Sequence, residues 1–191
     1  ELEVSLPRVG LHDVRNAAGV LALLGEMGYD IGLAAQGLTR FGGVSRRFED
    51  RGTVAGVRLI DDYAHHPTEL EAAIAAGRVG NPNRVWAVFQ PHLYSRTREH
   101  LEGFAAALGR ADEVVLTDIY AAREEPIPGV DGRSLHHAIT ASGGSGEYVP
   151  LRQDVAGYLA PLLKPGDTVL VLGAGDINLV TDELLDLLRG G

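Results

Sequence analysis

Two stretches of the sequence carry side chains that could bind a small charged molecule or move a proton. The first runs from Asp61 through Asp62, Tyr63, His65 and His66, and it lies between a strand-like run and an alanine-rich helical run. A carboxylate in such a turn can accept two ribose hydroxyls, and an imidazole can orient or deprotonate an amine. The alternative is that the carboxylates merely end a strand and the histidines are solvated. Because adjacent side chains point in different directions, we do not expect His65 and His66 to hold one metal ion.

The second stretch, residues 89–98 (FQPHLYSRTR), also follows a strand-like run. Its Arg96 is a natural fork for a carboxylate or a phosphate. If both strands belong to a parallel sheet, both stretches lie at the same edge, where ligands of open α/β sheets bind. The alternative is a helix start with ordinary surface arginines.

Two further motifs give weaker signals. The Arg46-Arg47 pair follows paired glycines and could be either a surface pair or a clamp that closes on a phosphate when two domains close. Gly173-Ala174-Gly175 resembles half of a dinucleotide-binding fingerprint, but Asn178 replaces its third glycine. We therefore expect a tight strand-to-helix turn there.

The elements that must position these residues alternate along the chain after residue 45. We predict a possible short edge strand at 2–6, strands at 54–60, 84–90, 113–119, 148–150 and 168–172, and helices at 14–27, 30–40, 67–78, 97–109, 132–140, 153–163 and 176–189. Alternation of this kind predicts an α/β fold, a Rossmann-like, mostly parallel sheet with helices on both faces, preceded by a short helical segment. The glycine pair at 42–43 suggests a domain boundary, giving domains 1–45 and 46–191.

Composition excludes several classes of function. The net charge of −9 among 191 residues argues against non-specific nucleic-acid binding and against an anionic membrane surface. The sequence has no cysteine, so disulfides and thiolate metal sites are excluded, and we expect no metal site. No apolar run approaches the roughly 20 residues that cross a bilayer, so a cytoplasmic protein is expected. The chain starts without Met, and its lone lysine, Lys164, precedes a proline rather than ending a phosphate-binding loop, so we expect part of a longer protein.

Taken together, five motifs resemble the Mur ligase family. They are residues 41–49 (FGGVSRRFE), 61–69 (DDYAHHPTE), 89–98 (FQPHLYSRTR), 119–129 (IYAAREEPIPG) and 173–177 (GAGDI). The likeness covers nearly the whole chain, and within the family it is to the member that joins L-alanine to UDP-N-acetylmuramate. The resemblance implies that residues 1–45 are the tail of a central ATP-binding domain and 46–191 a C-terminal amino-acid-binding domain.

The resemblance also implies roles for individual residues. It assigns ATP contacts to His12, Asp13, Asn16, Arg47 and Asp62. It assigns the alanine end of the site to Tyr63, His65, His92 and Arg96. Of these residues, it gives catalytic roles to Arg47, His65 and His92.

The implied reaction forms an amide bond through an acyl phosphate in peptidoglycan synthesis. It uses ATP and Mg²⁺ held mainly by the part of the ligase outside this chain, so we expect the chain to be inactive alone. Asp13 stands where many relatives have Asn, and Leu93 where some have Arg. The Asp13 departure leaves open whether this residue makes a hydrogen bond to adenine. The Leu93 departure leaves open whether the alanine carboxylate binds to Arg96 alone.

Three other interpretations remain at this stage. A sibling ligase attaches a ready-made tripeptide to the same sugar nucleotide during wall recycling. A non-catalytic nucleotide-binding module would bind ATP without any other domain. An NAD-dependent oxidoreductase would depend on Gly173–Gly175 alone.

Overall fold

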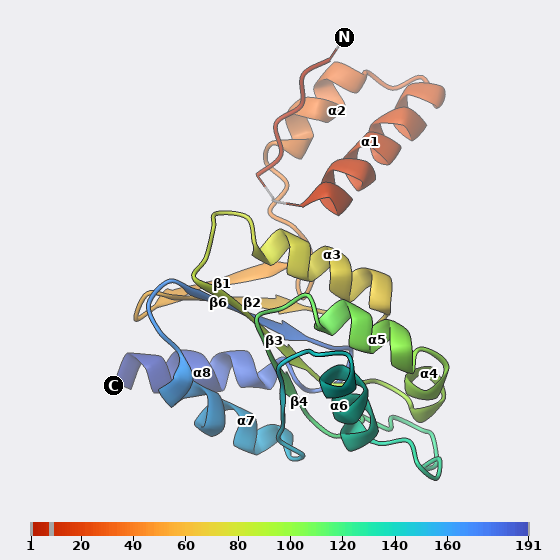
Figure 1. Ribbon diagram of the computed structural model, residues 1–191. Coiled ribbons are helices and arrows are strands. Elements are labelled where there is room, and N and C mark those ends of the chain that lie inside the picture. Colours follow the sequence, from red (N-terminus) through yellow and green to blue (C-terminus); the bar gives the residue numbers. More distant parts are fainter. Residues whose placement is uncertain (1, 8–9, 191) are drawn as a thin grey trace. The chain divides into compact units, whose positions relative to one another are not determined.

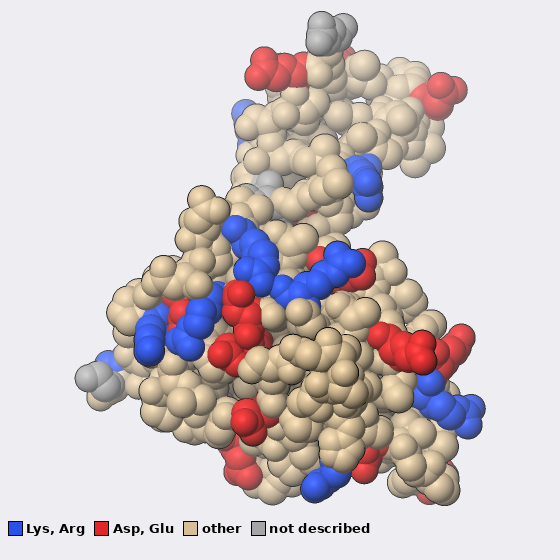
Figure 2. All heavy atoms as spheres, viewed as in Figure 1, with Lys and Arg blue, Asp and Glu red and all other residues tan. Residues whose placement is uncertain are grey.

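The computed structural model describes residues 2–7 and 10–190, and the chain divides into two compact units, Glu1–Val44 and Ser45–Gly191 (Figure 1). Among the described residues, no helix is both long and apolar enough to cross a membrane. Figure 2 shows acidic and basic side chains interspersed on the visible face of the second unit.

The first unit is a pair of helices, α1 (Leu11–Glu26) and α2 (Ile31–Leu38). Asp30 caps α2, because its side chain accepts the N–H groups of Gly32 and Leu33 at 2.8 and 3.0 Å. The possible strand at 2–6 is wrong, since none of these residues lies in a strand. Many apolar side chains of this unit are exposed, among them Leu11, Val14, Leu23 and Leu33.

The second unit contains a six-stranded sheet in the order β1-β2-β6-β3-β4-β5. Its strands are β1 (Glu49–Val54), β2 (Val57–Asp62), β3 (Arg84–Phe89), β4 (Glu113–Leu116), β5 (Glu147–Tyr148) and β6 (Asp167–Leu172). Within the described part of the chain, only β1 pairs antiparallel, with β2, and all other neighbouring strands pair in parallel. The predicted mostly parallel sheet is confirmed.

Helices cover both faces of this sheet (Figure 1). They are α3 (Pro67–Gly77), α4 (Tyr94–Glu99), α5 (Leu101–Leu108), α6 (Gly132–Ala141), α7 (Arg152–Leu159) with a short 3₁₀ turn η1 (Ala160–Leu162), and α8 (Leu179–Gly190). Helices α7 and α8 lie on one face, and α3, α5 and α6 on the other.

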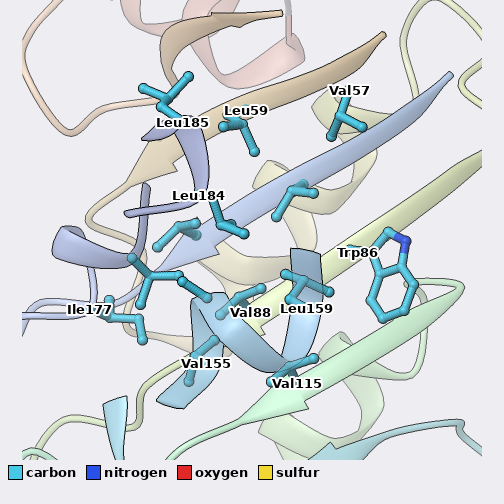
Figure 3. Packing of buried hydrophobic residues seen from close by; sticks show 14 residues of the cluster. Val57, Leu59, Trp86, Val88, Val115, Val155, Leu159, Ile177, Leu184 and Leu185 are labelled. Atoms are coloured by element: carbon cyan, nitrogen blue, oxygen red, sulfur yellow. The ribbon is translucent and has the colours of Figure 1, made fainter. Parts of the chain in front are cut away.

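Alternation along the strands builds two cores, because successive side chains point to opposite faces. Val57, Leu59, Val169 and Val171 face α7 and α8, where Leu184 is fully buried (Figure 3). On the other face, Phe89 lies 5.4 Å from Phe104 of α5, measured between ring centroids. Each of these buried side chains stabilises the folded state by roughly 1.5–3 kcal/mol relative to leaving it exposed, so both helical layers are firmly attached to the sheet.

Two predicted elements differ in the structure. The strand expected at 54–60 is half of a hairpin, because the chain turns at Ala55 and Gly56, both with positive φ. The helix expected at 97–109 is two helices, α4 and α5, separated by His100, whose φ of −114° and ψ of 20° are not helical. The sequence pattern therefore indicated the elements but not every break between them.

Candidate functional site

The two chemistry-bearing turns start at the same level of the sheet. Leu172, the last residue of β6, pairs with Asp62 of β2 on one side and with Phe89 of β3 on the other. All three strands run parallel, so the turns that follow Asp62 and Phe89 leave the same edge. The expectation that both turns share one edge is confirmed.

At this edge the structure brings Tyr63, His65, His92 and Arg96 together, and we call them the edge cluster. The ring of His65 lies 5.4 Å from that of Tyr63 and 6.4 Å from that of His92. The Nη1 atom of Arg96 lies 3.4 Å from Nδ1 of His92. The edge cluster therefore gathers two imidazoles, a phenol and a guanidinium from two separate motifs.

The neighbouring backbone fixes the hydrogen-bonding role of His65. Its Nδ1 lies 2.8 Å from the carbonyl oxygen of Tyr63, and a carbonyl can only accept, so Nδ1 donates. In the neutral ring the lone pair is then on Nε2. Glu69 supports this turn by accepting the N–H groups of His65 and His66, in a capping box at the start of α3. His65 can thus accept a proton at Nε2.

His92 has the opposite arrangement. Arg96 can only donate, so Nδ1 of His92 accepts and the neutral ring carries its hydrogen on Nε2. Burial lowers the pKa of His92, and the nearby charge of Arg96 lowers it further, which favours the neutral ring. The ring also stacks on Tyr120, with centroids 5.7 Å apart and planes 15° apart.

His66 points away from this cluster. Its Nδ1 accepts the N–H of Thr68 at the start of α3, and its ring packs against His100 with centroids 4.8 Å apart. The expectation that His65 and His66 diverge is confirmed. Among the described residues, no group of three or more His, Asp or Glu side chains could hold a metal ion.

Asp62 lies behind the edge cluster and is buried. Its Oδ1 accepts the N–H of Ala64 at 2.7 Å, and its Oδ2 accepts the N–H of Phe48 at 2.8 Å. Both carboxylate oxygens of Asp62 therefore accept backbone hydrogen bonds that order this turn. The hydrogen bond from Phe48 also connects the end of β2 to the segment before β1.

Arg46 and Arg47 both contact the edge cluster through Tyr63. Their guanidinium carbons lie 5.0 and 5.2 Å from the centre of its ring, a cation–π arrangement. Arg46 adopts a left-handed backbone conformation with a φ of 57°, and its side chain donates to the carbonyl oxygen of Gly173 at 2.7 Å. Arg46 therefore lies beside the predicted Arg47 at Tyr63, and it also connects Tyr63 to the turn after β6.

Asp61 is the most unusual carboxyl group of the site. It is 1% exposed, and its oxygens accept no hydrogen bond, although Nε of Arg46 lies 3.6 Å from Oδ2. Burial raises the pKa of Asp61 to about 6, despite the opposing charge of Arg46. Asp61 therefore differs from its neighbour Asp62 in lacking the backbone donors that Asp62 has.

The other predicted residues, His12, Asp13 and Asn16, lie on α1 in the first unit. Asp13 is in the first turn of α1 rather than at its N-cap, which is Gly10. His12 and Asp13 face each other at 3.8 Å between Nε2 and Oδ2, and Asn16 is exposed. Asp13 and Asn16 are three residues apart on a helix and so share a face.

Sequence reasoning gave no individual role to four residues that hold the edge cluster in place: Arg46, Glu69, Tyr120 and Glu124. Glu69 had a readable signal, since a Glu three residues after the helix N-cap is typical of a capping box. Arg46 was visible as a partner of Arg47. Tyr120 and Glu124 come from a loop after another strand, and their only sequence signal is the family-like motif at 119–129.

Comparison with known proteins places this geometry in a family. The family described as "Mur ligase, glutamate ligase domain" matches residues 46–175. The chain belongs to the Mur ligase family. Similar Mur ligases include the UDP-N-acetylmuramate–L-alanine ligase of Kineococcus radiotolerans, 48% identical over 98% of this chain and 40% of that protein.

Solved structures of Mur ligases share the fold. The crystal structure of the UDP-N-acetylmuramate–alanine ligase from Thermotoga maritima matches with a TM-score of 0.84 and 28% identity, over 100% of this chain and 40% of that one. A murein peptide ligase from Psychrobacter arcticus matches with a TM-score of 0.71 and 24% identity, over 98% of this chain and 39% of that one. The chain thus spans about 40% of the length of the Mur ligases that it resembles.

Proposed function

We propose that this chain is the C-terminal part of a UDP-N-acetylmuramate–L-alanine ligase, an ATP-dependent enzyme that forms an amide bond in peptidoglycan synthesis. The observation that carries the proposal is the edge cluster, which joins an imidazole with a free Nε2 lone pair to a guanidinium. A free amino acid needs both groups, one for its ammonium and one for its carboxylate. The 48% identical relative from Kineococcus radiotolerans is a UDP-N-acetylmuramate–L-alanine ligase, which supports the same conclusion.

In this proposal Arg96 binds the carboxylate of L-alanine, and His92 helps through its Nε2–H. Tyr63 lines the alanine pocket beside His65. The Nε2 atom of His65 accepts a proton from the alanine ammonium, which frees the amine lone pair. The amine then attacks the carbonyl carbon of the muramyl acyl phosphate. The tetrahedral intermediate expels phosphate, which takes the second proton of the amine nitrogen and leaves a neutral amide. Positioning the amine against the acyl carbon can contribute about 7–11 kcal/mol to lowering the barrier.

ATP supplies the phosphoryl group that activates the muramyl carboxylate. Contacts to ATP are proposed for His12, Asp13, Asn16, Arg47 and Asp62, with the buried Asp62 suited to ribose hydroxyls. Mg²⁺ is assigned to the preceding part of the ligase, and no step here depends on it.

The two units receive separate assignments. Residues 1–45 are proposed as the tail of the central ATP-binding domain, and residues 46–191 as the amino-acid-binding domain. The exposed apolar side chains of the first unit support this, because Leu23 is 61% and Leu33 is 68% exposed. Exposed apolar side chains that form one continuous patch mark an interaction surface, and we assign such a surface here to the remainder of the ligase. A cytoplasmic enzyme with no nucleic-acid or membrane partner completes the proposal.

The test is phosphate release from ATP with UDP-N-acetylmuramate and L-alanine. The chain alone is expected to release none. The same chain joined to the preceding segment of the Kineococcus ligase is expected to release phosphate when L-alanine is added. Phosphate release by the chain alone would disprove its dependence on another segment.

The acceptor identifies the member of the family. A tripeptide accepted in place of L-alanine would make the enzyme the sibling peptide ligase. Tight ATP binding by the isolated chain, without amide formation by the joined protein, would favour a nucleotide-binding module. Nicotinamide binding measured by calorimetry is expected to be absent, and its presence would favour the oxidoreductase.

A further inference from the structure

The loop at 119–129 is attached to the turn that carries His92 and Arg96. The N–H of Tyr120 donates to the carbonyl oxygen of Pro91 at 2.8 Å, and the carbonyl oxygen of Tyr120 accepts the N–H of Leu93 at 3.0 Å. These bonds form an isolated parallel bridge between His92 and Tyr120. The stacked ring of Tyr120 adds a side-chain contact to the same residue.

Glu124 extends this attachment to α4, the helix that bears Arg96. The Glu124 carboxylate accepts the N–H of Ser95 at 2.9 Å through Oε2 and the Ser95 hydroxyl through Oε1. The residue at the N-cap of α4 is Leu93, whose side chain cannot cap. Glu124 therefore supplies from another loop the acceptor that a Ser, Thr or Asp cap would normally supply.

The backbone at this turn needs such support. Leu93 has a φ of 72°, a left-handed conformation that non-glycine residues adopt rarely, and Ala122 in the loop has a φ of 53°. Strained residues of this kind persist where the surroundings fix them, and they cluster at ligand sites.

Glu124 also acts on the edge cluster electrostatically. The Ser95 hydroxyl and the Ser95 N–H lower the pKa of Glu124, so it is ionised at neutral pH. Its charge raises the pKa of His92, in opposition to the lowering by burial, Arg96 and His65. The loop thus influences both the orientation of α4 and the protonation of His92.

From this geometry we propose that Glu124 is a positioning residue for the incoming amino acid. By capping α4 it holds Arg96 against His92, and with Tyr120 it keeps the His92 ring in place. Glu124 itself touches neither alanine nor the acyl phosphate. The amino-acid role rests on the proposed function, whereas the positioning of His92 and α4 does not.

The first experiment uses the chain as it is. Imidazole titration by ¹⁵N NMR is measured for the wild type, for Glu124→Gln and for Ser95→Ala, with Glu125→Gln as the control, because Glu125 is the exposed neighbour in the same loop. In Glu124→Gln the pKa of His92 is expected to fall and the Ser95 amide to exchange faster, at least about tenfold. Ser95→Ala, which removes only the hydroxyl donor, is expected to give a smaller change in the same amide.

The second experiment uses the joined ligase. Glu124→Gln is expected to raise the KM for L-alanine by about tenfold, the effect of losing one charge-assisted contact, while kcat and the KM for ATP change less than about twofold. Glu124→Asp keeps the charge on a shorter side chain. Its His92 pKa should be close to the wild-type value, whereas its KM for L-alanine should stay closer to that of Glu124→Gln.

Two results would overturn the proposal. One is a His92 titration and Ser95 exchange in Glu124→Gln that match those of Glu125→Gln. The other is a loss of kcat with an unchanged alanine KM. Failure of the wild-type joined ligase to use alanine would contradict the proposed function, and the NMR experiment on the chain would still decide whether Glu124 positions His92.

Discussion

Gly175 lies against Tyr120: a Cβ atom placed on Gly175 would be 2.7 Å from Cγ of the Tyr120 ring and would also crowd Oε1 of Gln90. Tyr120 in turn stacks on His92. The glycine turn after β6 is therefore connected to the edge cluster through one aromatic ring. This close contact explains sterically why a glycine stands at position 175.

Gly175→Ala should displace Tyr120 and loosen the stacking on His92. Crowding a packed site by one carbon typically costs about 1–3 kcal/mol, so the free energy of unfolding should fall by that amount. The His92 ring signals should shift in NMR spectra. Urea unfolding of the chain measures the stability.

A matched control is available in α7. A Cβ placed on Gly157 has no atom within 4 Å, and this residue is exposed within a helix. Gly157→Ala should therefore stabilise the chain by about 0.5–1 kcal/mol. Equal destabilisation by both substitutions would contradict the steric explanation of the turn.

Arg96→Lys tests the proposed carboxylate contact. Lysine keeps the charge but loses the planar fork that matches a carboxylate, so the KM for L-alanine in the joined ligase should rise about tenfold or more. Arg98→Lys is the control, because Arg98 is exposed on the same helix. Equal alanine KM values in the two variants would remove Arg96 from the site.

Asp61→Asn should change how stability depends on pH. The pKa of Asp61 is raised from 3.8 to about 6, so the folded state binds its proton more tightly than the unfolded state does. The Asp61 contribution to stability is therefore complete below pH 3.8 and is lost as pH rises through about 6. Above pH 6 the neutral Asn should be more stable than Asp by on the order of 1–3 kcal/mol.

Urea unfolding at pH 5 and pH 8 provides the measurement for Asp61. The quantity to compare is the difference between wild type and Asp61→Asn at each pH, since this difference cancels the carboxyl groups that do not interact with Asp61. A stabilisation by Asn that does not grow from pH 5 to pH 8 would show that burial does not raise the Asp61 pKa.

Asp167→Ala tests a buried ion pair at the opposite end of β6. Burial raises the Asp167 pKa, but bonds from Arg84, the Lys164 N–H and the Trp86 indole outweigh this effect and lower it. Removing the carboxylate leaves these donors unpaired and should destabilise the chain by about 3–5 kcal/mol. Asp186→Ala, at an 82% exposed side chain, should change stability by less than about 0.5 kcal/mol.

The sequence predicts the parallel core of the sheet well, because the buried strands contain continuous apolar runs, residues 85–89 in β3 and 169–172 in β6. It does not reveal β1. Glu49, Asp50 and Arg51 make that segment look like a solvated loop, yet an edge strand that pairs on one side only tolerates charges. Local composition alone cannot distinguish these two cases.

The candidate site was also predicted only in part. The parallel direction of the strands was sufficient to predict that the turns after Asp62 and Phe89 share an edge. The contacts of Tyr120 with His92 and of Glu124 with Ser95 join segments that have no common sequence period, so no pattern predicts them. The roles of the individual site residues remain predictions for the experiments above.

The two borders of the sheet have a consequence for handling this protein. One border is β1, which carries charged side chains and a bulge between Asp50 and Gly52, and the other is β5, only two residues long. Neither offers a long, flat row of unpaired amides to a strand from another molecule. Concentrated solutions of the second unit should therefore resist fibril formation by edge-to-edge strand addition.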